Sequence, residues 1–220
     1  MPLTLNPVKI AINALATLRA GDARWTAAGL AVALSLAGGA AAQTHAVPTT
    51  GITTAYVLEG YSVLPPPGKN WFEMGRDKQH VLFGKKIESR THSFAATATS
   101  GLIDEKFETR EQFQNYVNKV RVADLGSERF KMLEFSSDFD PAFPAWCVRY
   151  RAKTQDRAAP FAIGRALLLE HIGITCLHPA MPDLVVDVGY SERGRPAEIS
   201  AELREEGESF MRSLKFTPRQ

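Results

Sequence analysis

The chain has 220 residues, of which 45% are hydrophobic, and this length and composition suit one folded domain with a sizeable core. Its 26 basic and 24 acidic side chains nearly cancel and leave a formal net charge of +2. That balance gives no indication of the strong basic charge by which proteins bind nucleic acids or anionic membranes.

Residues 1–42 have the layout of a secretory signal peptide. Arg24 precedes an apolar run over residues 26–37, and three small residues, Ala40 to Ala42, close the segment. Because signal peptidase requires small side chains before the cut, we expect cleavage after Ala42 and a periplasmic or secreted protein without stable membrane insertion. An uncleaved membrane anchor is the alternative, since about 20 apolar residues span a bilayer. The alanine-rich run and its small-residue end favour cleavage.

The mature chain then divides into a leader and one domain. Residues 43–55, QTHAVPTTGITTA, are small and polar without periodicity, which predicts a flexible leader. The remaining residues, 56–220, contain no further linker and predict a single domain. Cleavage after residue 42 leaves 23 basic and 23 acidic side chains, so we expect no nucleic-acid partner.

The first half of the domain predicts four strands. In residues 60–74, GYSVLPPPGKNWFEM, two apolar runs flank a triple proline, which cannot lie in a paired central strand, so we expect two strands joined by a loop. Residues 78–85 and 91–99 are rich in apolar, aromatic and threonine side chains and predict two more strands. Trp71 and Phe72, beside the proline loop, form either a candidate docking patch or part of the core.

Two histidines raise the question of a metal site. If these two later strands form a hairpin symmetric about Lys86, His80 and His92 face each other and make half of a zinc site. No third ligand is evident in the sequence, so we interpret both as surface or packing residues and expect no metal. We also expect no cofactor, because the sequence contains no phosphate loop, dinucleotide fingerprint or catalytic signature.

An amphipathic helix is predicted over residues 109–123. Thr109 and Gln112 have the spacing of a capping box, in which the hydroxyl accepts an early helical N–H and the amide reaches back. The apolar positions lie on one helical face, namely Phe113, Tyr116, Val117 and Val120. The carboxylates of residues 104–111, DEKFETRE, are interpreted as a solvated surface that favours the helix dipole.

The second half of the domain predicts a sheet and a closing helix. Residues 145–153, 166–178 and 183–193 are extended segments at short spacing, which favours an antiparallel meander. Residues 196–216 place an apolar stripe on one helical face, at Ile199, Leu203, Phe210 and Leu214. Residues 124–144 are assigned no element. The order of elements predicts an α+β fold, a mostly antiparallel sheet with two packed helices, one of them C-terminal, on one face.

The stretch GITCLHP, residues 173–179, raises the question whether Cys176 reacts, binds a metal or forms a disulfide. The chain has one other cysteine, Cys147, and two cysteines in an exported domain usually pair. If their strands are antiparallel neighbours with the cysteines opposed, Tyr150 faces Gly173, whose missing side chain leaves room for the ring. Opposed positions suit a disulfide. We therefore predict a structural disulfide between Cys147 and Cys176.

The order of elements resembles a known fold. An opening GYSVLPPPGKNW, strands that lead to a mid-chain helix, a meander, and a last helix that runs into FMRSLKF are similar to the PsbP-like fold superfamily over residues 61–216. That fold is shared by photosystem extrinsic proteins and a Ran-binding nuclear import factor. The resemblance implies a scaffold used for docking to partners, with no common catalytic residues.

Three functional hypotheses remain from the sequence. The first is a non-enzymatic, exported accessory or binding protein whose sheet or loops contact an envelope protein or a small ligand. The second is an extracytoplasmic hydrolase-type enzyme with a site of scattered polar residues such as His171, His178 and Glu192. The third is an envelope protein held by an uncleaved N-terminal anchor. The lack of a catalytic motif in the sequence favours the first hypothesis.

Overall fold

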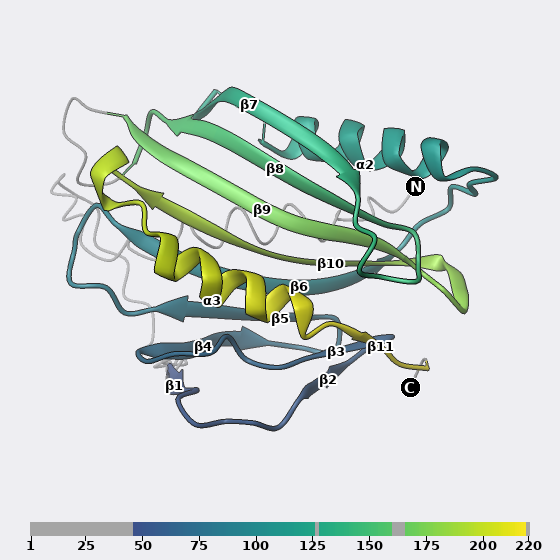
Figure 1. Cartoon of the computed structure of the whole chain (residues 1–220), viewed down its shortest axis with the longest axis horizontal. Helices are drawn as coiled ribbons and strands as arrows, with labels where there is room; N and C mark the ends of the chain where they lie inside the picture. The colour runs from purple at the N-terminus through teal and green to yellow at the C-terminus, as the bar shows by residue number, and fades with distance from the viewer. Residues whose placement is uncertain (1–45, 126–127, 160–165, 219–220) are drawn as a thin grey trace, which may run out of the picture.

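The computed structural model describes residues 46–125, 128–159 and 166–218. The predicted signal peptide and its cleavage site lie outside these residues. The described chain forms a large, mostly antiparallel sheet and a small second sheet, with one long helix on each face of the large sheet (Figure 1). The predicted α+β class, with a C-terminal helix, is confirmed. No helix among the described residues is long and apolar enough to cross a membrane.

The large sheet has the strand order β1-β4-β5-β6-β10-β9-β8-β7, and every neighbouring pair is antiparallel. Its strands are β1 (Val47–Pro48), β4 (Trp71–Arg76), β5 (His80–Lys85), β6 (Ser93–Leu102), β7 (Phe130–Phe139), β8 (Cys147–Asp156), β9 (Leu167–His178) and β10 (Met181–Gly194). The predicted meander corresponds to β8, β9 and β10. Because β10 pairs with β6, the meander joins the N-terminal strands into one continuous sheet.

The small sheet brings the two ends of the domain together. It consists of β2 (Tyr56–Leu58), β3 (Tyr61–Val63) and β11 (Lys215–Phe216), with β3 in the middle. The proline loop joins two strands as predicted, but β3 and β4 belong to different sheets. Three consecutive prolines lack the N–H groups that a ladder needs, so the chain changes sheet at this point.

Part of the predicted flexible leader is paired. Val47 and Pro48 form β1 opposite Glu73 and Phe72 of β4, and the Thr49 N–H donates to the Trp71 carbonyl at 3.0 Å. The small, polar composition of this segment concealed the pairing, because backbone hydrogen bonds make little demand on side chains.

The strand β7 lies within residues 124–144, where the sequence predicts no element. Its inward positions are Phe130, Met132, Phe135, Ser137 and Phe139, all but one of them apolar, but the register with β8 shifts between Met132 and Glu134. This β-bulge inserts one extra residue and breaks the period of two by which a strand is recognised. The bulge therefore explains why the alternation in residues 124–144 was not apparent.

The C-terminal helix α3 (Ala201–Arg212) covers the main apolar core, after a 3-10 turn at Pro196–Glu198. Ser200 caps it by accepting the Leu203 N–H at 3.3 Å. Phe210 and Met211 are fully buried in a cluster with residues of β5, β6, β9 and β10. Gly207 rests directly on the Tyr190 ring, where a larger residue would overlap it, so the helix lies close to the sheet.

The helix α2 (Arg110–Leu125) covers the other face. The predicted capping box is present. The Gln112 N–H donates to the Thr109 hydroxyl at 3.3 Å, and the Thr109 N–H donates to the Gln112 side-chain oxygen at 3.4 Å. Phe113 packs on Val148 of β8, whose neighbour Cys147 belongs to the core under α3. Because adjacent strand residues point to opposite faces, α2 and α3 lie on opposite faces, and the prediction that both cover one face was wrong.

The predicted disulfide is present and links the neighbouring strands β8 and β9 of the large sheet. Cys147 of β8 lies directly opposite Cys176 of β9, with their Cα atoms 4.0 Å apart, and both are buried. The strands β8 and β9 have the predicted register. Tyr150 lies opposite Gly173, where an added side chain would overlap the Tyr150 phenol. The disulfide and the glycine therefore select the same register.

Candidate functional site

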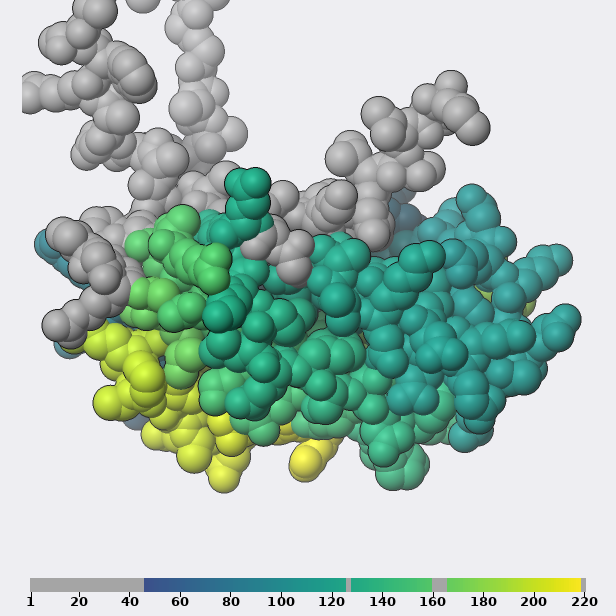
Figure 2. Space-filling view, turned by 90° about the horizontal axis from the view of Figure 1, so that it is seen from above, coloured from purple at the N-terminus to yellow at the C-terminus, as the bar shows by residue number. Residues whose placement is uncertain are grey.

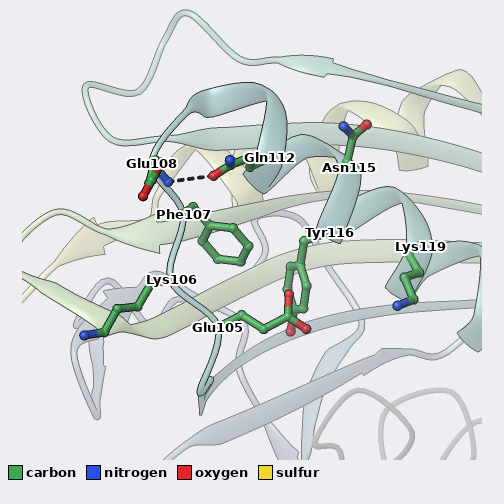
Figure 3. A pocket seen from close by; sticks show the side chains of 8 residues that line it. All are labelled: Glu105, Lys106, Phe107, Glu108, Gln112, Asn115, Tyr116 and Lys119. Carbon is green, nitrogen blue, oxygen red and sulfur yellow. Dashed lines mark hydrogen bonds between the residues drawn. The ribbon is translucent and has the colours of Figure 1, made fainter.

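A surface recess lies where the chain leaves β6 and enters α2. It has a volume of about 580 Å³, within the range of small-ligand sites. Its lining comes from one short segment, namely Glu105, Lys106, Phe107, Glu108, Gln112, Asn115, Tyr116 and Lys119 (Figure 3). Figure 2 shows the side chains of this segment, in teal, at the end of the molecule away from α3, in yellow.

Aromatic rings form the floor of the recess. The ring centroids of Phe107 and Tyr116 are 5.2 Å apart with their planes at 51°, so the two rings make an open notch (Figure 3). Phe113 lies beneath them, with its centroid 5.2 Å from that of Phe107, and is fully buried. The half-buried rings are thereby held from below by the core of α2, while part of each remains accessible.

Polar groups form the rim, and the helix cap orients one of them. The Gln112 Oε1 atom accepts the Glu108 N–H at 2.7 Å as well as the Thr109 N–H, which leaves the amide nitrogen to a ligand. Burial, and then the nearby Glu105 carboxylate, raise the pKa of Tyr116. The phenol therefore stays neutral at physiological pH and is a hydrogen-bond donor and acceptor.

A buried polar cluster fixes α2 to the sheet. Arg121 of α2 donates from Nη2 to Asp187 of β10 and, at 3.0 Å, to the Thr175 hydroxyl of β9. Thr175 donates in turn to Asp187 at 2.7 Å. The side chains of Arg121 and Asp187 are 3% and 7% exposed, so water screens this ion pair little. Burial alone would lower the pKa of Arg121, but Asp187 raises it and keeps the guanidinium charged.

His171 completes the cluster as a neutral side chain. Its Nε2 lies 3.3 Å from the Tyr150 hydroxyl, and Arg121 sits over the Tyr150 ring at 4.7 Å. Burial, and then the Arg121 charge, lower the pKa of His171 to about 3. Burial also raises the pKa of Tyr150. Neither group exchanges a proton near neutral pH, so the cluster positions α2 and does not form an acid–base pair.

The polar residues proposed for a hydrolase site are not brought together. His171 lies on the α2 face, whereas Glu192 lies on the α3 face, where it contacts His92 Nε2 at 2.8 Å and accepts the Ser200 N–H at 2.9 Å. His178 lies near the other end of β9 and accepts the Ala180 N–H at 3.1 Å. Each of these three side chains makes hydrogen bonds within its own part of the structure.

The two histidines considered for a metal site do not face each other. His80 is opposite Thr99, because the hairpin of β5 and β6 is centred between Ser89 and Arg90 and not at Lys86. His92 precedes β6 and contacts Glu192. Within the described residues, no group of three or more histidine, cysteine, aspartate or glutamate side chains is placed to hold a metal ion.

Trp71 and Phe72, the candidate docking patch, point to opposite faces of β4. Trp71 is 1% exposed, its ring packs against Phe94, and its Nε1 donates to Glu206 of α3 at 2.7 Å. Phe72 is partly buried and, as the next residue of β4, points to the other face. Trp71 therefore belongs to the core, which was the alternative interpretation.

The sequence did not identify the recess or the role of Arg121. The carboxylates of residues 104–111 were interpreted as a solvated surface, and Glu105 and Glu108 are indeed exposed, but they also border the recess. A signal was present in Phe107, an aromatic residue among charged ones in a loop. Arg121 follows the apolar stripe of α2 one turn after Val117, a position where a charge needs a buried partner.

Comparisons with known proteins give little beyond this geometry. No protein-family model matches the chain, and no curated protein matches it. Among solved structures, a mutant of the protein Mog1 is similar, with 9% sequence identity and a TM-score of 0.37. The match covers 75% of this chain and 96% of the Mog1 chain.

Proposed function

We propose that this protein is an exported, non-enzymatic accessory or binding protein that holds its ligand in the recess at the start of α2. The observation that carries the proposal is the recess itself, an accessible aromatic notch with a polar rim. Binding sites commonly combine such apolar surface with a few placed polar groups. The ligand is an envelope protein or a small molecule outside the cytoplasm.

The support beneath the recess favours binding. Arg121 joins α2 to Asp187 and Thr175 through directional hydrogen bonds, while Phe113 packs against the sheet through Val148. Side chains on a helix fixed in this way lose little conformational freedom when a ligand binds. A rigid, preorganised surface of this kind suits a docking scaffold of the type that the PsbP-like resemblance implies.

The arrangement of the histidines also supports a non-enzymatic role. A hydrolase built on His171 and Glu192 would require both side chains at one site, but they lie on opposite faces of the sheet. The lowered pKa of His171 removes it as a proton acceptor near neutral pH. The separation of these residues and the lowered pKa of His171 therefore argue against the hydrolase hypothesis.

Export is supported by the signal-peptide pattern of residues 1–42 and by the disulfide. A buried cross-strand disulfide between Cys147 and Cys176 is compatible with an oxidising compartment and is uncommon in the cytoplasm. We expect the mature protein to begin at or near Gln43.

The test uses isotope-labelled chain that is expressed at full length and purified from the periplasm. N-terminal sequencing is expected to place the first residue near Gln43. Extracts of the cell envelope, separated into protein and small-molecule or glycan fractions, are then added while amide resonances are recorded. At least one fraction is expected to shift the resonances of residues 105–119, and Tyr116→Ala is expected to abolish the shifts. Shifts confined to α3, or chemical conversion of an added compound, would contradict the proposal.

A further inference from the structure

We infer that the recess binds an uncharged carbohydrate chain. This inference rests on the proposed function, because it names the ligand class of the same recess. Three features of the lining carry it, namely the cancellation of charge, the tilted aromatic pair and the mixture of hydrogen-bond donors and acceptors.

The charges around the recess cancel. Glu105 and Glu108 carry two negative charges, and Lys106 and Lys119 carry two positive charges, all on exposed side chains. A strongly charged ligand would meet attraction and repulsion within one short site, so this lining gives no net electrostatic preference for an anion or a cation. A neutral ligand avoids the cost of desolvating its own charge.

The aromatic notch suits the apolar face of a sugar ring. Phe107 and Tyr116 lie at 51° to each other, so a flat group placed against one ring also touches the other. Pyranose rings have one or both faces covered by C–H groups, which bury apolar area against an aromatic face. Phe113 holds both rings from below, so stacking requires little rearrangement.

The rim supplies partners of both kinds for hydroxyl groups. A sugar hydroxyl donates one hydrogen bond and accepts two. The Gln112 amide nitrogen and the lysines donate, the glutamates accept, and Asn115, one turn after Gln112, does both (Figure 3). The recess is open to solvent along the exposed start of α2, so a chain can enter and leave it without being enclosed.

The binding experiment uses an N-acetylglucosamine tetramer and a maltose-series tetramer as probes, added to the same periplasm-derived protein. Saturable shifts of residues 105–119 are expected with at least one of the two probes, with Kd of about 1 mM or tighter. Because the ligand is uncharged, raising the salt concentration from about 50 mM to about 500 mM is expected to change Kd by less than about twofold. Which tetramer binds more tightly distinguishes amino-sugar chains of the cell wall from other glycans.

Variants distinguish a loss of binding through ring stacking from a loss of binding through unfolding. Tyr116→Phe is expected to keep Kd within about threefold, because the ring remains, and Tyr116→Ala is expected to weaken binding at least about tenfold. Asn115→Ala is expected to weaken binding, whereas Glu111→Ala, an exposed neighbour on α2 outside the recess, is the matched control and is expected to have no effect. Far-UV circular dichroism and Tm identify any variant that has lost its fold.

Each other outcome overturns the inference. If neither tetramer shifts residues 105–119 while an envelope protein fraction does, the carbohydrate inference fails and the proposed binding function stands. If the tetramers bind elsewhere, or bind with a steep dependence on salt, the inference also fails. If no fraction and no tetramer affects the recess, both the inference and the proposed function fail.

Discussion

The two long helices are attached to the same sheet by different physical means. Under α3, Phe210 and Met211 are fully buried in an apolar cluster, and the Phe210 ring meets Phe83 edge to face at 5.7 Å. Its ion pairs are more exposed than that of α2, since Lys85 and Glu206 are 11% and 14% exposed and Arg149 and Glu208 are 36% and 17% exposed. Hydrophobic burial dominates this attachment, and that force is strong but non-directional.

The helix α2 makes a smaller apolar contact with the sheet, and a buried ion pair joins the helix to the sheet. Arg121 and Asp187 are almost inaccessible, and Thr175 and Tyr150 complete their surroundings. Hydrogen bonds of this kind require particular distances and angles, so they select one placement of the helix. Hydrophobic burial therefore holds α3 on the sheet, whereas directional hydrogen bonds hold α2, the helix that carries the recess, in one position.

The largest effect is expected from breaking the buried ion pair. Arg121→Met leaves Asp187 buried without its cation and is expected to lower the free energy of unfolding by about 3 to 5 kcal/mol. The matched change on the other face, Arg149→Met, is expected to cost less than about 1 kcal/mol, because that pair is partly exposed and screened. Urea unfolding of both variants measures the difference, and equal losses would refute the comparison.

A second variant isolates the orphaned charge. If the loss comes from the uncompensated carboxylate, then Arg121→Met combined with Asp187→Leu recovers part of the stability. A double variant as unstable as Arg121→Met alone would instead assign the loss to packing.

The next effect concerns the disulfide, which lies in the core under α3. Replacing both Cys147 and Cys176 by alanine opens a loop of 29 residues and is expected to lower the free energy of unfolding by about 3 to 4 kcal/mol. The α2 cluster lies on the opposite face, so amide shifts and ligand response of residues 105–119 are expected to persist at low temperature. Thiol titration in denaturant confirms that the wild-type protein has no reactive thiol. Collapse of the recess together with α3 would show that the two faces are not independent.

The next prediction concerns the pH dependence of stability, whose effect is small within any one pH unit. The pKa of His171 is lowered from 6.5 to about 3, so below pH 6.5 the unfolded chain binds a proton that the folded chain does not. Stability therefore falls as the pH drops from 6.5 towards 3, by at most about 1.4 kcal/mol per pH unit, and the effect is absent above this window. His171→Gln does not titrate and is expected to show a shallower loss between about pH 6.5 and pH 4.5. Parallel profiles of the two proteins would contradict this assignment.

The smallest effect concerns the first turn of α2. Thr109→Ala removes the hydroxyl that accepts the Gln112 N–H and is expected to cost about 1 kcal/mol. Hydrogen exchange is expected to rise in residues 110–113 and to leave α3 unchanged, because the loss is local. Ser200→Ala, which removes the corresponding cap of α3, is the matched control and is expected to affect only that helix.

Much of the local structure was determined by the sequence itself. The capping box at Thr109 and the apolar stripe of α2 depend on residues within one or two turns; the capping box was confirmed, and Phe113 and Val117 of the stripe are buried. The meander and its register were also predictable, because Cys147 and Cys176 can pair only if their strands align at one position. In these cases the determining contacts are either near in sequence or specified by a chemically unique pair.

The positions of these elements in the fold depend on contacts between residues that are far apart in the sequence. An apolar stripe shows that a helix packs on something, but whether α2 and α3 share a face depends on the path by which the chain crosses between β6 and β7. Pairing with β1 and β5 orients β4 so that the Trp71 side chain points into the core. In β7, a bulge interrupts the alternation by which the sequence would indicate a strand. The helix α2, which carries part of the recess, is fixed by Arg121 to buried partners more than fifty residues away, on β9 and β10. Contacts across such distances leave no periodic trace in the sequence, since any buried acid on a neighbouring strand could satisfy the arginine.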